Sequence, residues 1–143
     1  MRDTAPRGMM RPNVQTVRKA FDAFVRRDVD ALVAIMDPEV EFAAPVTQAL
    51  VGRAGPYRGY EGVREYFADV AEAWEELEVF LHEYHESEDG RVLVVGRVRT
   101  RDRKGEQLEE PVQWAWRIRD GKIVAGQVFS DRVAALAATG LAA

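Results

Sequence analysis

The first third of the chain carries apolar residues at helical spacing. Residues 13–27 have an apolar side chain every three or four positions, which is one stripe of an amphipathic helix. That stripe consists of Val14, Val17, Phe21 and Phe24. Asn13 is the expected N-cap of this helix. Asp28 is the expected cap of a second short helix, which we expect to end at Pro38 because proline cannot continue the backbone hydrogen bonding.

A short strand, a long loop and a third helix are predicted next. Residues 39–43 alternate between polar and apolar, as a half-buried strand does. Residues 44–59 are rich in glycine and proline, which predicts a loop, and loops this long in a compact domain are often functional. A helix is expected over residues 61–76. Its inward stripe is Val63, Tyr66, Phe67, Val70 and Trp74.

From Leu77 onwards the apolar period changes from 3.6 to 2, and four strands follow. They are predicted at residues 77–86, 91–102, 106–119 and 122–131. Short glycine-containing turns separate them and leave no room for crossover helices, so the sheet should be mostly antiparallel. A last helical turn is expected at 132–138, ending at Gly140. The fold class is therefore α+β, with three N-terminal helices covering part of a strongly curved sheet and leaving a pocket at its uncovered end.

Composition limits the possible classes of protein. A chain of 143 residues, 47% hydrophobic and 31% charged, suits one globular domain, expected at 13–143 behind a flexible leader at 1–12. No apolar run approaches the roughly 20 residues that span a bilayer, and the first residues lack the apolar segment of a secretory signal. The absence of cysteine excludes disulfides and thiolate chemistry, and agrees with a cytoplasmic protein. The net charge of −4 argues against general binding to nucleic acid or to anionic membranes.

The sequence predicts no metal and no cofactor. His82 and His85 are three residues apart on a predicted strand, so they point to opposite faces and cannot chelate one ion. The glycines around the predicted turn do not follow a strand in the spacing of a dinucleotide-binding loop.

Aromatic residues are the first candidates for a ligand pocket. Trp114 and Trp116 share one face of a predicted strand and make a large apolar wall, which can be core, pocket or both. Tyr57 and Tyr60 flank the turn at Gly59, where their hydroxyls could donate to a ligand oxygen. Packing within the loop is the more common role for such tyrosines.

The arginine row from Arg97 to Arg103 has two possible orientations. With a two-residue turn at Lys104-Gly105, Arg97 and Arg99 share the tryptophan face and could bind a carboxylate. With a three-residue loop, the valines of that strand join the tryptophans and the arginines face outwards. The second register separates apolar from polar side chains better.

Four stretches, in their order along the chain, resemble the SnoaL-like branch of the nuclear-transport-factor-2-like superfamily. They are FDAFVRRDVDALVAIMDPEVEF, YRGYEGVREYF, WAWRIRDGKIV and VFSDRVAALAATGL, and the resemblance covers roughly residues 13–141. It implies a cone-shaped sheet that binds a small apolar or aromatic molecule, and a homodimer. Relatives include polyketide cyclases, ketosteroid isomerases, limonene-epoxide hydrolases and non-catalytic binding proteins.

The catalytic groups of the best-understood relatives do not carry over. The isomerases' base and two oxyanion donors correspond to Ala44, Ala20 and Trp114 here. The hydrolases' Arg-x-Asp corresponds to Arg97-Val98-Arg99, so the arginine is present and its acidic partner is not. Their remaining aspartate aligns nearer Val128 than Asp131.

Asp131 is the strongest single catalytic candidate. It ends the last predicted strand, on the same period-2 face as Gln127 and Phe129, and the resemblance places an acid of this kind in the pocket. There a carboxylate would have a raised pKa and could act as acid or base. The alternative is a helix cap or a surface ion pair with Arg132. The resulting hypotheses are a pocket protein with proton-transfer chemistry of isomerase, cyclase or hydrolase type, or a non-catalytic ligand-binding or dimeric interaction module.

Overall fold

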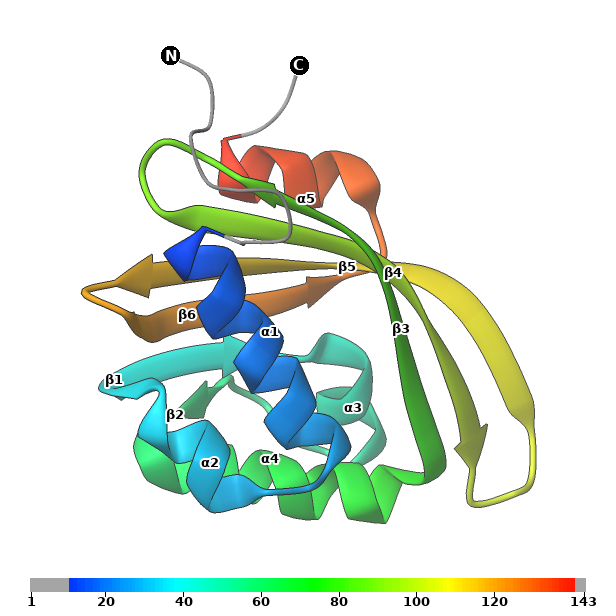
Figure 1. The fold of residues 1–143 in the computed structure, drawn as a ribbon. Coiled ribbons are helices and arrows are strands. Elements are labelled where there is room, and N and C mark those ends of the chain that lie inside the picture. Colours follow the sequence, from blue (N-terminus) through cyan, green and yellow to red (C-terminus); the bar gives the residue numbers. More distant parts are fainter. Residues whose placement is uncertain (1–10, 141–143) are drawn as a thin grey trace.

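The computed structural model describes residues 11–140 as helices on a curved sheet (Figure 1). The helices are α1 (Pro12–Val25), α2 (Val29–Ala34), α3 (Pro45–Leu50), α4 (Gly59–Ala73) and α5 (Arg132–Thr139). The strands are β1 (Met36–Ala43), β2 (Tyr57–Arg58), β3 (Trp74–Glu86), β4 (Arg91–Asp102), β5 (Gln107–Arg119) and β6 (Lys122–Phe129). This order confirms the predicted α+β class.

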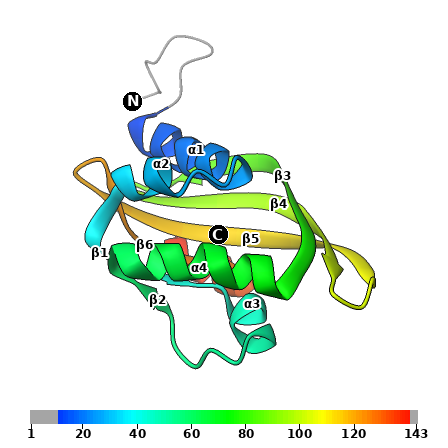
Figure 2. The same cartoon turned by 90° about the horizontal axis from the view of Figure 1, so that it is seen from below.

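The strands form one sheet in the order β2-β1-β6-β5-β4-β3. All neighbouring strands are antiparallel except β1 and β6, which are parallel. The sheet is thus mostly antiparallel, as predicted. Its long strands curve around α1 and α4, while α5 packs on the opposite face (Figures 1 and 2).

Both N-terminal helices end earlier than the sequence predicts, and α1 also begins one residue earlier. Pro12 is the first residue of α1 and Arg11 its N-cap, so Asn13 lies inside the first turn. Residues 11 and 12 of the predicted leader therefore belong to α1 and its cap. Residues 1–10 lie outside the described residues. Asp28 caps α2 as expected, by accepting a hydrogen bond from the backbone N–H of Ala31 at 3.1 Å.

Pro38 does not end a helix but lies within β1. The β1 register against β6 shifts between Met36 and Glu41, so residues 37–40 form an irregular stretch. A proline is tolerated there because the strand pairing is irregular at this point and does not need a hydrogen bond from its backbone nitrogen.

The predicted loop at 44–59 contains secondary structure of its own. Pro45 starts α3, since a proline at the first helical position lacks only an N–H that would have no partner there. The buried Gln48 side chain accepts from the Ala44 N–H at 2.7 Å and donates to the Gly55 carbonyl at 2.9 Å. One side chain thus holds both ends of the segment between β1 and β2.

The third predicted helix ends earlier than expected. Trp74 has extended backbone angles and is the first residue of β3, so α4 stops at Ala73. None of the helices within residues 11–140 combines the length and apolar character needed to cross a membrane.

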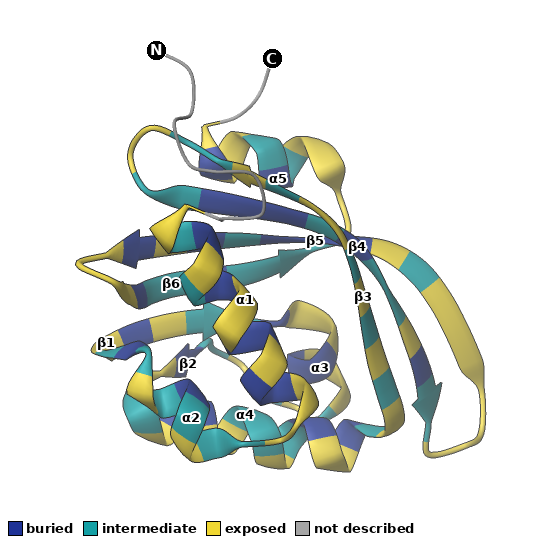
Figure 3. Ribbon diagram, viewed as in Figure 1, coloured by how far each residue is buried: buried dark blue, intermediate teal, exposed yellow. Residues whose placement is uncertain are grey.

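The core lies between α1, α4 and the concave face of the sheet. Val17, Val92, Val94 and Ile123 are completely buried there, whereas the outward side of α1 is exposed (Figure 3). Both sides of β4 and β5 are covered near their middle, because α5 packs against the outer face and buries Leu93. The concave face remains unfilled at one end, where the site lies.

Candidate functional site

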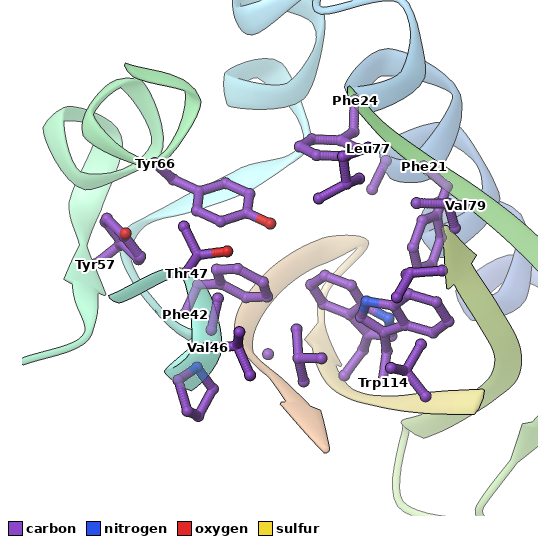
Figure 4. A pocket seen from close by; sticks show the side chains of 18 of the residues that line it. Phe21, Phe24, Phe42, Val46, Thr47, Tyr57, Tyr66, Leu77, Val79 and Trp114 are labelled. Carbon is purple, nitrogen blue, oxygen red and sulfur yellow. The ribbon is translucent and has the colours of Figure 1, made fainter. Parts of the chain in front are cut away.

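A cavity of about 210 Å³ lies between the concave face of the sheet and helices α1, α3 and α4 (Figure 4). Its wall is mostly aliphatic and aromatic. The aromatic residues that line it are Phe21, Phe24, Phe42, Tyr57, Tyr66, Trp74, Trp114 and Trp116. The polar residues that line it are Thr47, Thr100, Glu110 and Ser130, besides the two tyrosines.

The aromatic rings hold one another in place. Phe21 from α1 meets Trp114 and Trp116 edge-on, with ring centroids 5.1 and 5.7 Å apart. Phe42 stacks on Trp116 at 5.6 Å with an interplanar angle of 8°, and Tyr66 meets Phe42 edge-on at 4.9 Å. These are favourable geometries for aromatic pairs. The cavity therefore has a rigid wall formed by two helices and two strands.

The size of the cavity limits its occupant. A dry apolar cavity of about 150 Å³ is enough to hold benzene. At 210 Å³ the cavity accommodates one substituted ring or a small fused pair.

Two donors on the wall have no hydrogen-bond partner among residues 11–140. The Tyr66 hydroxyl points into the cavity (Figure 4) and makes no hydrogen bond to any residue in 11–140. Burial raises the pKa of Tyr66, so its hydroxyl stays protonated at neutral pH and can donate. The indole N–H of Trp116 is buried and has no acceptor in the same part of the chain.

Glu110 is the one charged residue among the described residues that line the cavity. It pairs with Val98 of β4, and both side chains project to the concave face. It is half-buried and forms no ion pair or hydrogen bond with another described residue. An unpaired carboxylate at an otherwise apolar cavity is a candidate binding or acid–base group.

The period-2 pattern of β5 contains a signal for Glu110, which is not among the predicted pocket residues. On β5 the even-numbered residues face inwards, and the inward row reads Leu108, Glu110, Val112, Trp114, Trp116 and Ile118. A single acid among apolar residues on the inward face of a strand indicates a polar group at the core or at a binding site.

The structure brings three of the predicted pocket residues to the cavity: Trp114, Trp116 and Tyr57. The Tyr57 hydroxyl is not free, because it donates to Asp69 at 2.9 Å. Burial, followed by this hydrogen bond, raises the pKa of Tyr57. Tyr60 does not line the cavity, and its hydroxyl faces the Met36 carbonyl at 3.4 Å.

Arg97 also lies outside the cavity. The Asp102 N–H donates to the Glu106 carbonyl at 3.0 Å, which leaves a three-residue turn, Arg103 to Gly105, between paired residues. In this register Val94 pairs with Trp114 and Val92 with Trp116. The arginines then occupy the outer face, and Arg97 bonds to Glu109 at 3.0 Å. This register corrects the assignment of Arg97 to the pocket and agrees with the second of the two orientations.

A β-bulge in β6 decides which of its side chains face the cavity. Trp114 pairs with Val128 and Trp116 with Gly126. Side chains directly opposite each other project to the same face, so Val128 and Gly126 line the cavity beside the indoles.

The bulge reverses the alternation expected for the end of this strand. Ile123 is buried opposite Ile118, and an unbroken alternation from it would turn the later odd-numbered residues inwards. The register shift after Ile123 turns the even-numbered residues inwards instead. The expected pocket-facing row is therefore corrected, and none of its members lines the cavity: Gln127, Phe129 and Asp131.

Asp131 is exposed and caps α5, where its carboxylate accepts from the Val133 N–H at 2.9 Å. We expect Asp131→Ala to lower the free energy of unfolding by about 1 kcal/mol, because the cap is lost. Asp131→Asn should stay near wild type, since asparagine caps equally well. Denaturant unfolding followed by circular dichroism measures both. A loss of ligand binding in Asp131→Asn would contradict this assignment.

The positions at which ketosteroid isomerases keep catalytic groups do lie at the cavity. Ala20, Ala44 and Trp114 all line it, and none has a titratable side chain. Dienol chemistry of that kind therefore has neither base nor oxyanion donor at these positions.

The histidines are far from metal-binding geometry. His82 and His85 are exposed on β3, and His85 contacts Glu83 at 2.8 Å. Within residues 11–140 no group of three or more potential metal-ligating side chains is present.

Comparisons with known proteins agree with this architecture. The model of the SnoaL-like domain family matches residues 17–126. An uncharacterised protein of Mycobacterium tuberculosis is 33% identical over 99 residues, which is 68% of this chain and 72% of the relative.

Two solved structures are particularly similar. An NTF2-like protein of unknown function from Burkholderia pseudomallei superposes with a TM-score of 0.77 at 26% identity, covering 91% of this chain and 98% of that one. TerC, co-crystallised with polyporic acid, superposes with a TM-score of 0.76 at 27% identity, covering 87% and 95%. The fold, the cavity and the family match together show that this chain belongs to the SnoaL-like domain family, with an NTF2-like fold.

Proposed function

We propose that this protein binds a small, largely apolar, ring-containing molecule inside its cone. The observation that carries the proposal is the 210 Å³ cavity with its aromatic wall. Small-molecule sites are typically concave and apolar, with a few polar groups that fix the orientation of the ligand. The Tyr66 hydroxyl and the Glu110 carboxylate are such groups here.

The comparisons support a small-molecule ligand. The relative TerC was crystallised with polyporic acid, and it shares 27% of its aligned residues with this chain.

Binding is favoured over a defined reaction. The outward position of Asp131 removes the acid expected to carry proton transfer. Any chemistry of isomerase, cyclase or hydrolase type would have to use Glu110 as acid or base, with Tyr66 as a donor.

Filling the cavity tests the proposal. We expect Val128→Phe to weaken the binding of the neutral probe 2-phenylethanol at least about tenfold, because the new ring occupies part of the space the probe needs. Val128 lines the cavity and is only partly buried, so the substitution adds volume where there is room. Isothermal titration calorimetry, with tryptophan fluorescence as a second signal, gives the affinity.

Gln127→Phe is the matched control. It adds a ring at the neighbouring residue of β6, which does not line the cavity. We expect wild-type affinity for this variant. Equal affinities in all three proteins, or no binding to the wild type, would refute the proposed pocket.

A further inference from the structure

We propose that the natural ligand is a small amine whose ring fills the cone and whose ammonium group binds Glu110. This inference rests on the proposed function and specifies the chemical class of the ligand. The observation behind it is the position of one unpaired carboxylate on a wall that is mostly apolar and aromatic and has no other charged residue among those described.

Glu110 lies at the boundary between the cavity interior and solvent. Along the inward row of β5, Leu108 is 55% exposed, Glu110 is half-buried, and Val112 is 5% exposed. A ligand that enters the cone can therefore leave its polar end at Glu110 while its ring reaches Trp114. The ammonium remains partly hydrated there, which limits the desolvation that a buried charge would suffer.

The charge of the residues that line the cavity favours a cationic ligand. No lysine, arginine or histidine in the described part of the chain lines the cavity. The arginines of β4 that could have held a carboxylate face outwards, as the bond from Arg97 to Glu109 shows. An anionic ligand would meet the charge of Glu110 without a compensating cation, whereas an ammonium gains a charge-assisted hydrogen bond.

The aromatic wall receives the ring of such a ligand. Trp114, Trp116, Phe42 and Tyr66 line the same cavity. Edge-to-face and offset-stacked contacts between aromatic rings are favourable, so these residues can hold the ring while the ammonium stays at Glu110. The combination of an aromatic wall with one carboxylate suits an arylalkylammonium ion better than a neutral ring compound.

Three probes that share one ring but differ in charge test the inference: 2-phenylethylamine, 2-phenylethanol and phenylacetate. For the wild type we expect the amine to bind at least about tenfold more tightly than the alcohol, and phenylacetate more weakly than the alcohol. In Glu110→Gln the amine should bind no more tightly than the alcohol, because the carboxylate that holds the ammonium is gone. Calorimetry at neutral pH measures all three.

Glu109→Gln is the control, because it removes the same charge one residue away on the outer face, where Glu109 pairs with Arg97. It should keep the preference for the amine. The inference is overturned if the amine binds no better than the alcohol, if the preference survives Glu110→Gln, or if phenylacetate binds most tightly. In those cases binding of the alcohol still upholds the proposed pocket. Failure of all three probes to bind overturns both.

Discussion

Replacing Phe21 with alanine is expected to lower the free energy of unfolding by about 3–5 kcal/mol. Phe21 is 7% exposed, and its ring forms T-shaped contacts with both cavity tryptophans. The ring centroids are 5.1 Å apart for Trp114 and 5.7 Å apart for Trp116. Its loss removes the main aromatic contact between α1 and the sheet. Both indoles are held by β5, and Trp116 is also held by Phe42, so the gap can close only in part.

The same substitution should also change ligand size preference. Because the void left by Phe21 adjoins the cavity, a fused-ring alcohol should gain affinity relative to 2-phenylethanol. Denaturant unfolding gives the stability, and calorimetry gives the affinity ratio.

Val25→Ala is the control for this prediction. It lies on the same helix but is 60% exposed, so its substitution should change the stability by at most about 0.5 kcal/mol. A Phe21→Ala protein within about 1 kcal/mol of wild type would show that the helix is held by other contacts.

Gly96→Ala is expected to destabilise the protein by about 3 kcal/mol. A Cβ atom at this position would lie 2.1 Å from the carbonyl oxygen of Phe80 on the neighbouring strand. The oxygen belongs to the backbone, next to the β-bulge of β3 between Leu81 and Glu83, so it cannot rotate away as a side chain would. Relief requires the two strands to separate locally, which breaks ladder hydrogen bonds.

Gly55→Ala is the matched control, since no atom lies within 4 Å of its added Cβ and its backbone angle is ordinary. It should unfold like the wild type in urea. If Gly96→Ala also matches the wild type, the close approach of β3 and β4 does not constrain this position.

Much of the architecture follows from local patterns. The helical stripe that contains Phe21 and Phe24, and the alternation that contains Trp114 and Trp116, correctly predict both the elements and their buried faces. These predictions are correct because a helix or strand that buries one face needs apolar residues on that face, which recur every 3.6 residues in a helix and every second residue in a strand. Trp74 shows where they fail: it matches the helical period of α4, yet it begins the next strand.

Most of the errors at the site have one physical origin. The orientation of a strand's side chains depends on its register with its neighbour, and a single extra residue reverses it. The bulge after Ile123 does this to Gln127 and Phe129, whereas Asp131 lies beyond the end of β6 and caps α5. The outward direction of Arg97 follows from the register that the sequence pattern favours. Glu110, on the regular part of β5, needs no such correction, and its alternation with Val112 already indicates an inward acid.

The sequence alone determines the order of the longer helices and strands, the mostly antiparallel character of the sheet, and the two tryptophans of its concave face, but not α3 or β2. Each of these depends on interactions between residues close together in the chain. The tertiary structure decides which acid meets the cavity, because that choice depends on pairing between strands and on the folding of α3 across residues 45–50. It places Glu110 at the cavity and Asp131 at a helix cap, since register and bulges arise only when the strands come together.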